Sequence, residues 1–124
     1  MLLSGCVRSG LGDFSRWIDK FEGAYFRATG VHLFPGTLNV ELESEFSMPE
    51  ACLRLEKADL GGAVAVSLVP CRINGRPAFI LRTDPNDEGV GPHPRSILEI
   101  AADVKLRDHF GLKDGDSVVI EVDA

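Results

Sequence analysis

Leu33-Phe-Pro-Gly-Thr-Leu-Asn-Val-Glu-Leu42 is the stretch from which the fold of this chain is best deduced. Its Pro-Gly turn leads into alternating apolar and polar residues, which predicts a strand over 37–43. Side chains of a strand repeat every two residues, so the apolar ones share one face and need a core. The opposite face begins with Thr37 and Asn39, whose hydroxyl and amide oxygens are hard ligands that Mg²⁺ accepts. The pattern alone leaves a solvated polar face and a metal site both open.

Length and composition predict one small globular domain. The chain has 124 residues, of which 44% are apolar and 26% charged, as is ordinary for a globular protein. The chain has no apolar run near the roughly 20 residues that cross a bilayer. Residues 1–6 lack the basic start and the length of a signal peptide. We therefore expect a single domain over residues 1–124, with no membrane attachment.

Net charge and cysteine content indicate which partners and which cellular compartment to expect. The formal net charge is −6, which argues against nucleic acid as a partner because the phosphate backbone requires a basic footprint. Cys6, Cys52 and Cys71 lie far apart without CxxC spacing, so they predict neither a disulfide framework nor a zinc site. We expect a monomer in a reducing cytoplasm that binds small molecules.

The strand signals predict a mainly β protein. Besides 37–43, strands are expected over 2–9, 63–73, 76–82, 97–101 and 117–122, with a shorter one near 51–55. Asn74-Gly75 separates two apolar runs and indicates a hairpin with a type I′ turn. Pro70 and Pro77 cannot donate to a ladder, so they are expected at edges or bulges. Strands joined mostly by short turns indicate a closed or partly closed barrel.

Two helices are expected outside the barrel. Aromatic residues at three- and four-residue spacing predict an amphipathic helix over 15–29 that ends at Gly30, with its aromatic stripe in the core. A second, short helix is predicted over 104–110, with Asp103 as its N-terminal cap and Gly111 at its end.

Two loops are candidate ligand contacts. Gly10 and Gly12 allow close approach of the backbone, and successive amides there can bind an anion, although an ordinary turn is the alternative. The full dinucleotide and Walker patterns are absent, so neither a Rossmann nor a P-loop site is supported. The loop over 83–96 holds three prolines and two glycines. A loop this long in a small domain is typical of a functional lid or a mobile segment.

Five motifs in order resemble the CTP-dependent riboflavin kinases first recognised in archaea. They are Gly10-Leu-Gly-Asp13, Leu-Phe-Pro-Gly-Thr-Leu-Asn-Val at 33–40, Leu-Glu-Ile-Ala at 98–101, Val-Lys-Leu-Arg at 104–107 and Leu-Lys-Asp-Gly-Asp at 112–116. The resemblance covers residues 4–122. It implies a six-stranded cradle-loop β-barrel with two flanking α-helices. It also implies Mg²⁺-dependent transfer of the γ-phosphoryl group of CTP to the 5′-hydroxyl of riboflavin, giving FMN and CDP.

The resemblance also implies roles for individual residues. Thr37 and Asn39 match the Mg²⁺ ligands, and Glu99 matches a flavin contact. The matches to the nucleotide-binding residues are Gly10, Leu11, Gly12, Asp13, Val104, Lys105, Leu106 and Arg107. A second flavin contact falls on Gly91, where the family has Thr. Nearby His93, Arg95 and Ser96 are the candidates to substitute for that Thr.

Elementary chemistry agrees with these roles. Phosphoryl transfer needs in-line positioning and neutralised phosphate charge more than covalent help. The start of the helix after Asp103 offers free amides to an anion, and Lys105 and Arg107 add positive charge there. Glu99 is the predicted catalytic residue, which orients or deprotonates the attacking hydroxyl. A strand-end carboxylate that reaches solvent is the alternative for Glu99.

Two other functions stay open from the sequence. The first loop continues as Phe14-Ser15-Arg16, unlike the usual family pattern, and Gly91 replaces a Thr. These departures leave room for a kinase with a different acceptor, or for a non-catalytic nucleotide- or flavin-binding module on the same barrel. The block over 112–118 also occurs in swapped-hairpin transcription factors, but the acidic charge argues against DNA.

Overall fold

The computed structural model describes residues 1–9 and 14–122. The strands in these ranges are β1 (Leu2–Arg8), β2 (Leu38–Leu42), β3 (Leu53–Leu55), β4 (Val66–Ile73), β5 (Arg76–Thr83), β6 (Ile97–Ala101) and β7 (Ser117–Val122). The helices are α1 (Phe14–Lys20), α2 (Glu22–Thr29), α3 (Asp84–Asp87), α4 (Leu106–His109) and the 3-10 turn η1 (Lys57–Leu60). The protein is mainly β, as predicted.

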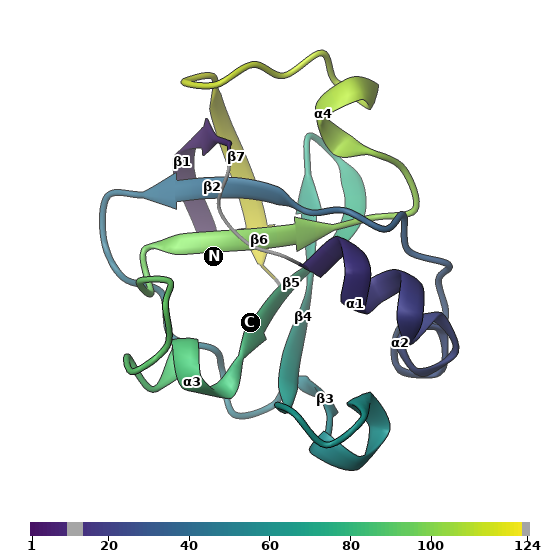
Figure 1. Ribbon diagram of the computed structural model, residues 1–124. Coiled ribbons are helices and arrows are strands. Elements are labelled where there is room, and N and C mark those ends of the chain that lie inside the picture. Colours follow the sequence, from purple (N-terminus) through teal and green to yellow (C-terminus); the bar gives the residue numbers. More distant parts are fainter. Residues whose placement is uncertain (10–13, 123–124) are drawn as a thin grey trace.

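Six strands close into an antiparallel barrel (Figure 1). Their hydrogen-bonded order is β4-β5-β6-β2-β1-β7, and β7 returns to β4 through the pairs Cys71↔Val122 to Ile73↔Ile120. The short β3 pairs with β4 and lies outside this ring. The predicted six-stranded barrel is therefore confirmed, and the short strand expected near 51–55 is an addition to it.

The β4–β5 hairpin confirms the turn prediction. Asn74 and Gly75 both have positive φ, 49° and 79°, as a type I′ turn requires. On its other edge β4 pairs with β3 at residues 66–68 and with β7 at residues 71–73, so Pro70 lies between the two ladders. Pro77 lies beyond the stretch of β5 that pairs with β6. Both prolines occupy edge positions where a missing N–H costs no ladder bond.

Two apolar clusters fill the molecule on opposite sides of the barrel wall. The barrel interior holds side chains such as Val40, Ile80 and Leu98, all fully buried. The second cluster packs α1 and α2 against the outer face of the wall, where Leu81 belongs to β5. Ile80 and Leu81 thus belong to different clusters, because neighbouring residues of a strand point to opposite faces.

The helix predicted over 15–29 is two helices, so that prediction was wrong in its continuity. Phe21 separates α1 from α2 with φ −113° and ψ 34°. The break lets both helices present apolar residues to the barrel, Ile18 from α1 and Tyr25 from α2. Gly30 ends α2 as predicted, with φ 74° and its N–H bonded to the Phe26 carbonyl at 2.7 Å. Within the described ranges the chain contains no helix with the length and apolar content to cross a bilayer.

The predicted cap of the last helix was also wrong. α4 begins at Leu106, after Lys105 as N-cap, and no side chain caps it. Asp103 instead accepts hydrogen bonds from the Arg76 guanidinium at 2.9–3.0 Å, because the tertiary fold brings a cation to it. The predicted end is confirmed: Gly111 has φ 61°, and the next N–H bonds back to the Arg107 carbonyl in a Schellman arrangement.

Candidate functional site

The candidate site is built on two neighbouring strands. The antiparallel register of β2 and β6 sets Asn39 directly opposite Glu99. Both side chains lie on the outer face of the barrel, since their neighbours in sequence, such as Leu38 and Leu98, fill the interior. Asn39 is nevertheless only 8% exposed and Glu99 only 5%. The alternation predicted for 37–43 is confirmed over Leu38–Leu42, and on its polar face Asn39 is buried whereas Glu41 is exposed.

The Asn39 side chain offers an unused oxygen. Its Oδ1 atom is buried and accepts no hydrogen bond from the residues that the structure describes. Such an atom costs about 1–3 kcal/mol unless a ligand satisfies it. Thr37 precedes the start of β2 by one residue, on the same face as Asn39, and is partly exposed. These two oxygens fit a hard cation such as Mg²⁺. Groups of three or more His, Cys, Asp or Glu that suit a metal are absent from residues 1–9 and 14–122.

A small basic recess lies at one end of the β2–β6 pair. Its volume is about 70 Å³, and its lining residues are Phe34, Gly36, Thr37, Leu38, Ile100, Lys105, Leu106 and Arg107. The structure thus brings three of the four predicted nucleotide contacts around the last helix next to Thr37. Val104 is the exception, since it packs against the barrel core instead.

Arg107 connects this recess to the end of β1. Its guanidinium donates to the Ser9 hydroxyl at 2.9 Å and to the Asp114 carboxylate at 2.8 Å. Hydrogen bonds from Ser9 and then from Arg107 hold the pKa of Asp114 below its ordinary value. The predicted nucleotide contacts Gly10, Leu11, Gly12 and Asp13 follow Ser9 directly, but they lie outside the described residues.

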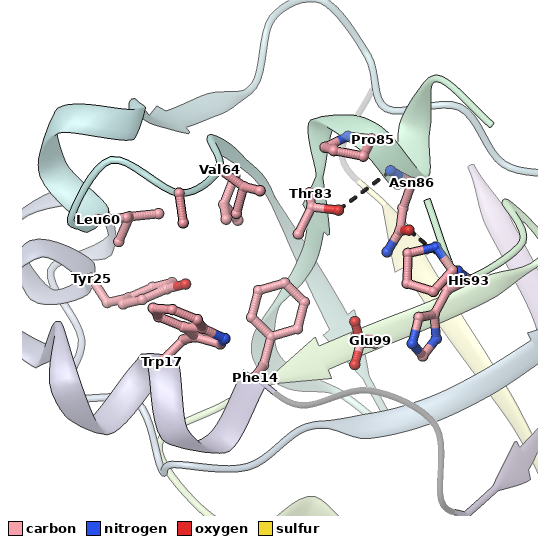
Figure 2. A pocket seen from close by; sticks show the side chains of 13 residues that line it. Phe14, Trp17, Tyr25, Leu60, Val64, Thr83, Pro85, Asn86, His93 and Glu99 are labelled. Atoms are coloured by element: carbon pink, nitrogen blue, oxygen red, sulfur yellow. Dashed lines mark hydrogen bonds between the residues drawn. The ribbon is translucent and has the colours of Figure 1, made fainter. Parts of the chain in front are cut away.

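A larger aromatic cavity opens next to Glu99 (Figure 2). Its volume is about 260 Å³. Its lining residues are Phe14, Trp17, Tyr25, Leu60, Ala63, Val64, Val66, Thr83, Pro85, Asn86, Pro92, His93 and Glu99. Apolar and aromatic walls with a few convergent polar groups are typical of small-molecule sites. Of the predicted flavin contacts, His93 and Glu99 line this cavity.

The short helix α3 brings a polar side chain to the cavity that the sequence did not predict. Thr83 caps α3 by accepting a hydrogen bond from the Asn86 N–H at 3.3 Å, and Pro85 stands in the first turn. Asn86 is 7% exposed, and its Oδ1 accepts from the His93 N–H at 3.3 Å. Asn86 therefore ties the loop that carries His93 to α3. A Thr cap followed by Pro is a signal by which this helix was predictable.

Gly91, the other predicted flavin contact, lies against Asn86. A Cβ atom at Gly91 would stand 2.0 Å from Asn86 Oδ1 and 2.8 Å from its backbone nitrogen. Only glycine therefore allows Asn86 to take this position. Gly91 is not among the lining residues of the aromatic cavity, and its role as a flavin contact stays a prediction.

Arg82 lies directly before the loop over 83–96, which carries Asn86, and its side chain binds the backbone near the end of that loop. Its side chain is only 3% exposed. It donates to the Asp87 carboxylate at 3.2 Å and to three backbone carbonyls, those of Phe46, Arg95 and Ile97. Burial lowers the pKa of Arg82, and the hydrogen bond to Asp87 opposes that effect. The loop over 83–96 is thus fastened to the barrel by one buried cation.

Helices α1 and α2 supply the opposite wall of the cavity. Tyr25 is 1% exposed, and its hydroxyl has no hydrogen-bond partner in the described part of the chain. Burial, followed by the negative charge of Glu99, raises the pKa of Tyr25, so the hydroxyl keeps its proton. Trp17 lines the cavity with its ring stacked on Phe21 at 5.9 Å between centroids. The aromatic stripe predicted as core therefore also forms a cavity wall.

Known proteins share this chain's sequence over nearly its whole length. The family model CTP-dep_RFKase, described as domain of unknown function DUF120, matches residues 7–122. The riboflavin kinase of Pyrobaculum arsenaticum is 32% identical over 130 residues, which cover 97% of this chain and 60% of that protein. The riboflavin kinase of Methanocella arvoryzae is also 32% identical over 130 residues, covering 98% of this chain and 57% of that protein.

The relatives differ in length. This chain spans about 60% of the two proteins just named. It covers 99% of the riboflavin kinase of Methanobrevibacter smithii, at 30% identity over 132 residues, which are 98% of this chain.

Proposed function

The chain belongs to the CTP-dependent riboflavin kinase family, and we propose that it transfers the γ-phosphoryl group of CTP to the 5′-hydroxyl of riboflavin. The observation that carries this proposal is the register of β2 and β6. The pair Leu38↔Ile100 lines the basic recess, and in the next pair, Asn39↔Glu99, the Glu99 side chain lines the aromatic cavity. A donor in one space and an acceptor in the other would meet at these strands.

The aromatic cavity is the proposed site of the flavin ring. Flat aromatic rings pack well against aromatic side chains, and Phe14, Trp17 and Tyr25 line this space. The volume of about 260 Å³ is close to the lower end of the range for ligand pockets, roughly 300–1,000 Å³. His93 and Glu99 are the polar groups nearest the position proposed for the reacting hydroxyl.

The basic recess is the proposed site of the nucleotide phosphates. Lys105 and Arg107 supply positive charge there. Thr37 and Asn39 would hold Mg²⁺ through their side-chain oxygens, and the bound ion would neutralise phosphate charge during transfer. The unused Asn39 oxygen supports this assignment, because a cation would satisfy it.

Glu99 is the proposed catalytic residue. The 5′-hydroxyl oxygen forms a bond to the γ-phosphorus while the bond from that phosphorus to the β–γ bridging oxygen breaks, and CDP leaves with the electron pair. Glu99 accepts the hydroxyl proton as general base. Its burial, 5% exposed, keeps bulk water away from this proton transfer.

The purified protein tests the proposal when it is incubated with riboflavin, Mg²⁺ and either CTP or ATP. We expect FMN and CDP in equal amounts with CTP, and no product after EDTA treatment. Glu99→Gln should bind riboflavin but form FMN about 100-fold more slowly or worse, whereas the exposed Glu121→Gln should act like the native protein. Nucleotide binding without FMN from any nucleoside triphosphate would contradict the kinase proposal and indicate a non-catalytic binding module.

A further inference from the structure

Two buried polar groups face the aromatic cavity from opposite sides (Figure 2). The Tyr25 hydroxyl, on α2, has no hydrogen-bond partner among the residues that the structure describes. Asn86, on α3, uses its Oδ1 atom for the His93 N–H, which leaves the amide nitrogen to face the cavity and Glu99. A buried donor without an acceptor is costly in an apolar setting, so the Tyr25 hydroxyl calls for a ligand acceptor. The Asn86 amide nitrogen is a second donor that faces the same cavity (Figure 2).

We propose that Tyr25 and Asn86 are specificity-determining residues that hydrogen-bond two different parts of the flavin. Tyr25 donates to an acceptor on the polar edge of the isoalloxazine ring. Asn86 donates to a hydroxyl of the ribityl chain. The inference rests on the proposed function and adds to it the groups that distinguish a flavin from other flat molecules.

The division between ring and chain follows from where Glu99 lies. The ribityl chain ends in the hydroxyl that Glu99 must reach, so that chain runs toward β6. Asn86 lies on the same side of the cavity as Glu99, whereas Tyr25 lies across the cavity beside Trp17 and Leu60 (Figure 2). The ring therefore occupies the Tyr25 side and the chain passes Asn86.

The protonation states agree with this division. Burial and the nearby Glu99 charge raise the pKa of Tyr25, so its hydroxyl remains a donor across the neutral range. An amide nitrogen donates at every pH. Both residues thus present donors, and a flavin carries carbonyl and ring-nitrogen acceptors on its pyrimidine edge and hydroxyl oxygens on its chain.

Tryptophan fluorescence provides a binding assay that does not depend on turnover. Trp17 is the single tryptophan of the chain and lines the cavity, so a flavin bound there should quench its emission. The full chain is titrated with riboflavin and with lumiflavin, which has the same isoalloxazine ring but a methyl group in place of the ribityl chain. We expect the native protein to bind both compounds.

Two variants separate the two contacts. Tyr25→Phe should lose about tenfold in affinity for both compounds. Asn86→Asp keeps the oxygen that accepts from His93 but removes the donor, so it should lose about tenfold in affinity for riboflavin and little for lumiflavin. Thr29→Val is the matched control, because its hydroxyl bonds the Tyr25 carbonyl within α2 and does not line the cavity. It should leave both affinities unchanged.

Thermal unfolding distinguishes a ligand contact from a structural role. Tyr25→Phe removes a hydroxyl without a described partner, so its melting temperature should equal or exceed that of the native protein. A lower melting temperature together with native affinity would indicate a structural hydroxyl and overturn the role of Tyr25.

Equal losses of affinity for both compounds in Asn86→Asp would overturn the ribityl assignment. If the native protein binds neither compound, the proposed function fails and this inference fails with it.

Discussion

The basic recess and the aromatic cavity differ in how the chain builds them. The recess draws its lining from two short continuous segments, 34–38 and 105–107, together with Ile100. The cavity draws its lining from α1, α2, the region around η1, α3, the following loop and the strands β4, β5 and β6. A site made of continuous segments is recognisable as a motif, whereas one made of scattered residues exists only in the folded chain.

The two spaces also differ in their chemistry. Lys105 and Arg107 keep 55% and 30% of their side chains exposed, so the recess offers solvated charge that salt screens. The cavity instead buries polar groups, the Tyr25 hydroxyl and the Asn86 amide, among apolar walls. Binding in the recess should therefore depend on charge, and binding in the cavity on hydrogen bonds that water does not weaken.

The largest expected effect tests whether the cavity depends on its buried cation. Arg82→Met leaves three carbonyls and the partly exposed Asp87 without their donor, and because each buried acceptor left unsatisfied costs about 1–3 kcal/mol, the total is about 3–5 kcal/mol. We expect that loss in the free energy of unfolding measured in urea, with a weaker affinity for riboflavin. Arg72→Met, on the exposed side of the same hairpin, should change stability by at most about 0.5 kcal/mol. Equal stabilities of the two variants would remove Arg82 from its role as anchor.

The second largest expected effect tests the pairing of β2 with β6, where the basic recess and the aromatic cavity meet. Asn39→Leu removes the buried oxygen that accepts no described hydrogen bond, so stability should stay the same or rise. FMN formation should fall about 100-fold, because the group proposed to hold the metal is lost. A rate assay and a thermal melt of the same sample provide both readings. The control is Glu41→Ala, since Glu41 is an exposed residue on the same face of the strand, and it should keep native activity. If Asn39→Leu is fully active, the metal is bound elsewhere.

The smallest effect concerns the rim of the cavity, where Arg54 on β3 holds Asp84 at the start of α3. The bonds are 2.6 and 2.9 Å long, and the Arg54 hydrogen bonds hold the pKa of Asp84 below its ordinary value. A carboxyl with a lowered pKa in the folded state stabilises the fold above its unfolded pKa, about 3.9 for Asp, and loses that contribution as the pH falls through the folded pKa.

The corresponding measurement compares the native protein with Asp84→Asn over a range of pH. Because the pair is partly exposed, we expect a difference of about 0.2–1 kcal/mol in unfolding free energy between pH 6 and 8. The difference should shrink below about pH 4. A difference that persists unchanged at pH 2 would show that Asp84 acts through packing rather than charge.

Local elements were the most predictable part of this protein. The strands over 97–101 and 117–122 and the Asn74-Gly75 turn were found where the local pattern placed them. Errors occurred where a distant residue intervened. Asp103 fits a helix cap by its position in the sequence, but Arg76 binds its carboxylate. The helix over 15–29 fits one amphipathic pattern, but the structure has two shorter helices that both pack against the barrel wall.

The candidate site likewise has one part that the local sequence pattern predicts and another that depends on the tertiary structure. The pattern of residues 33–42 predicts a strand with Thr37 and Asn39 on one face, because strand periodicity is a local property. That Asn39 is buried, and that it stands opposite Glu99, follows from the pairing of β2 with β6 across more than fifty residues of chain. Tyr25 and Asn86 carry no local sign of a shared role. They line one cavity because α2 and α3 pack around the same barrel wall, and only the tertiary structure decides that.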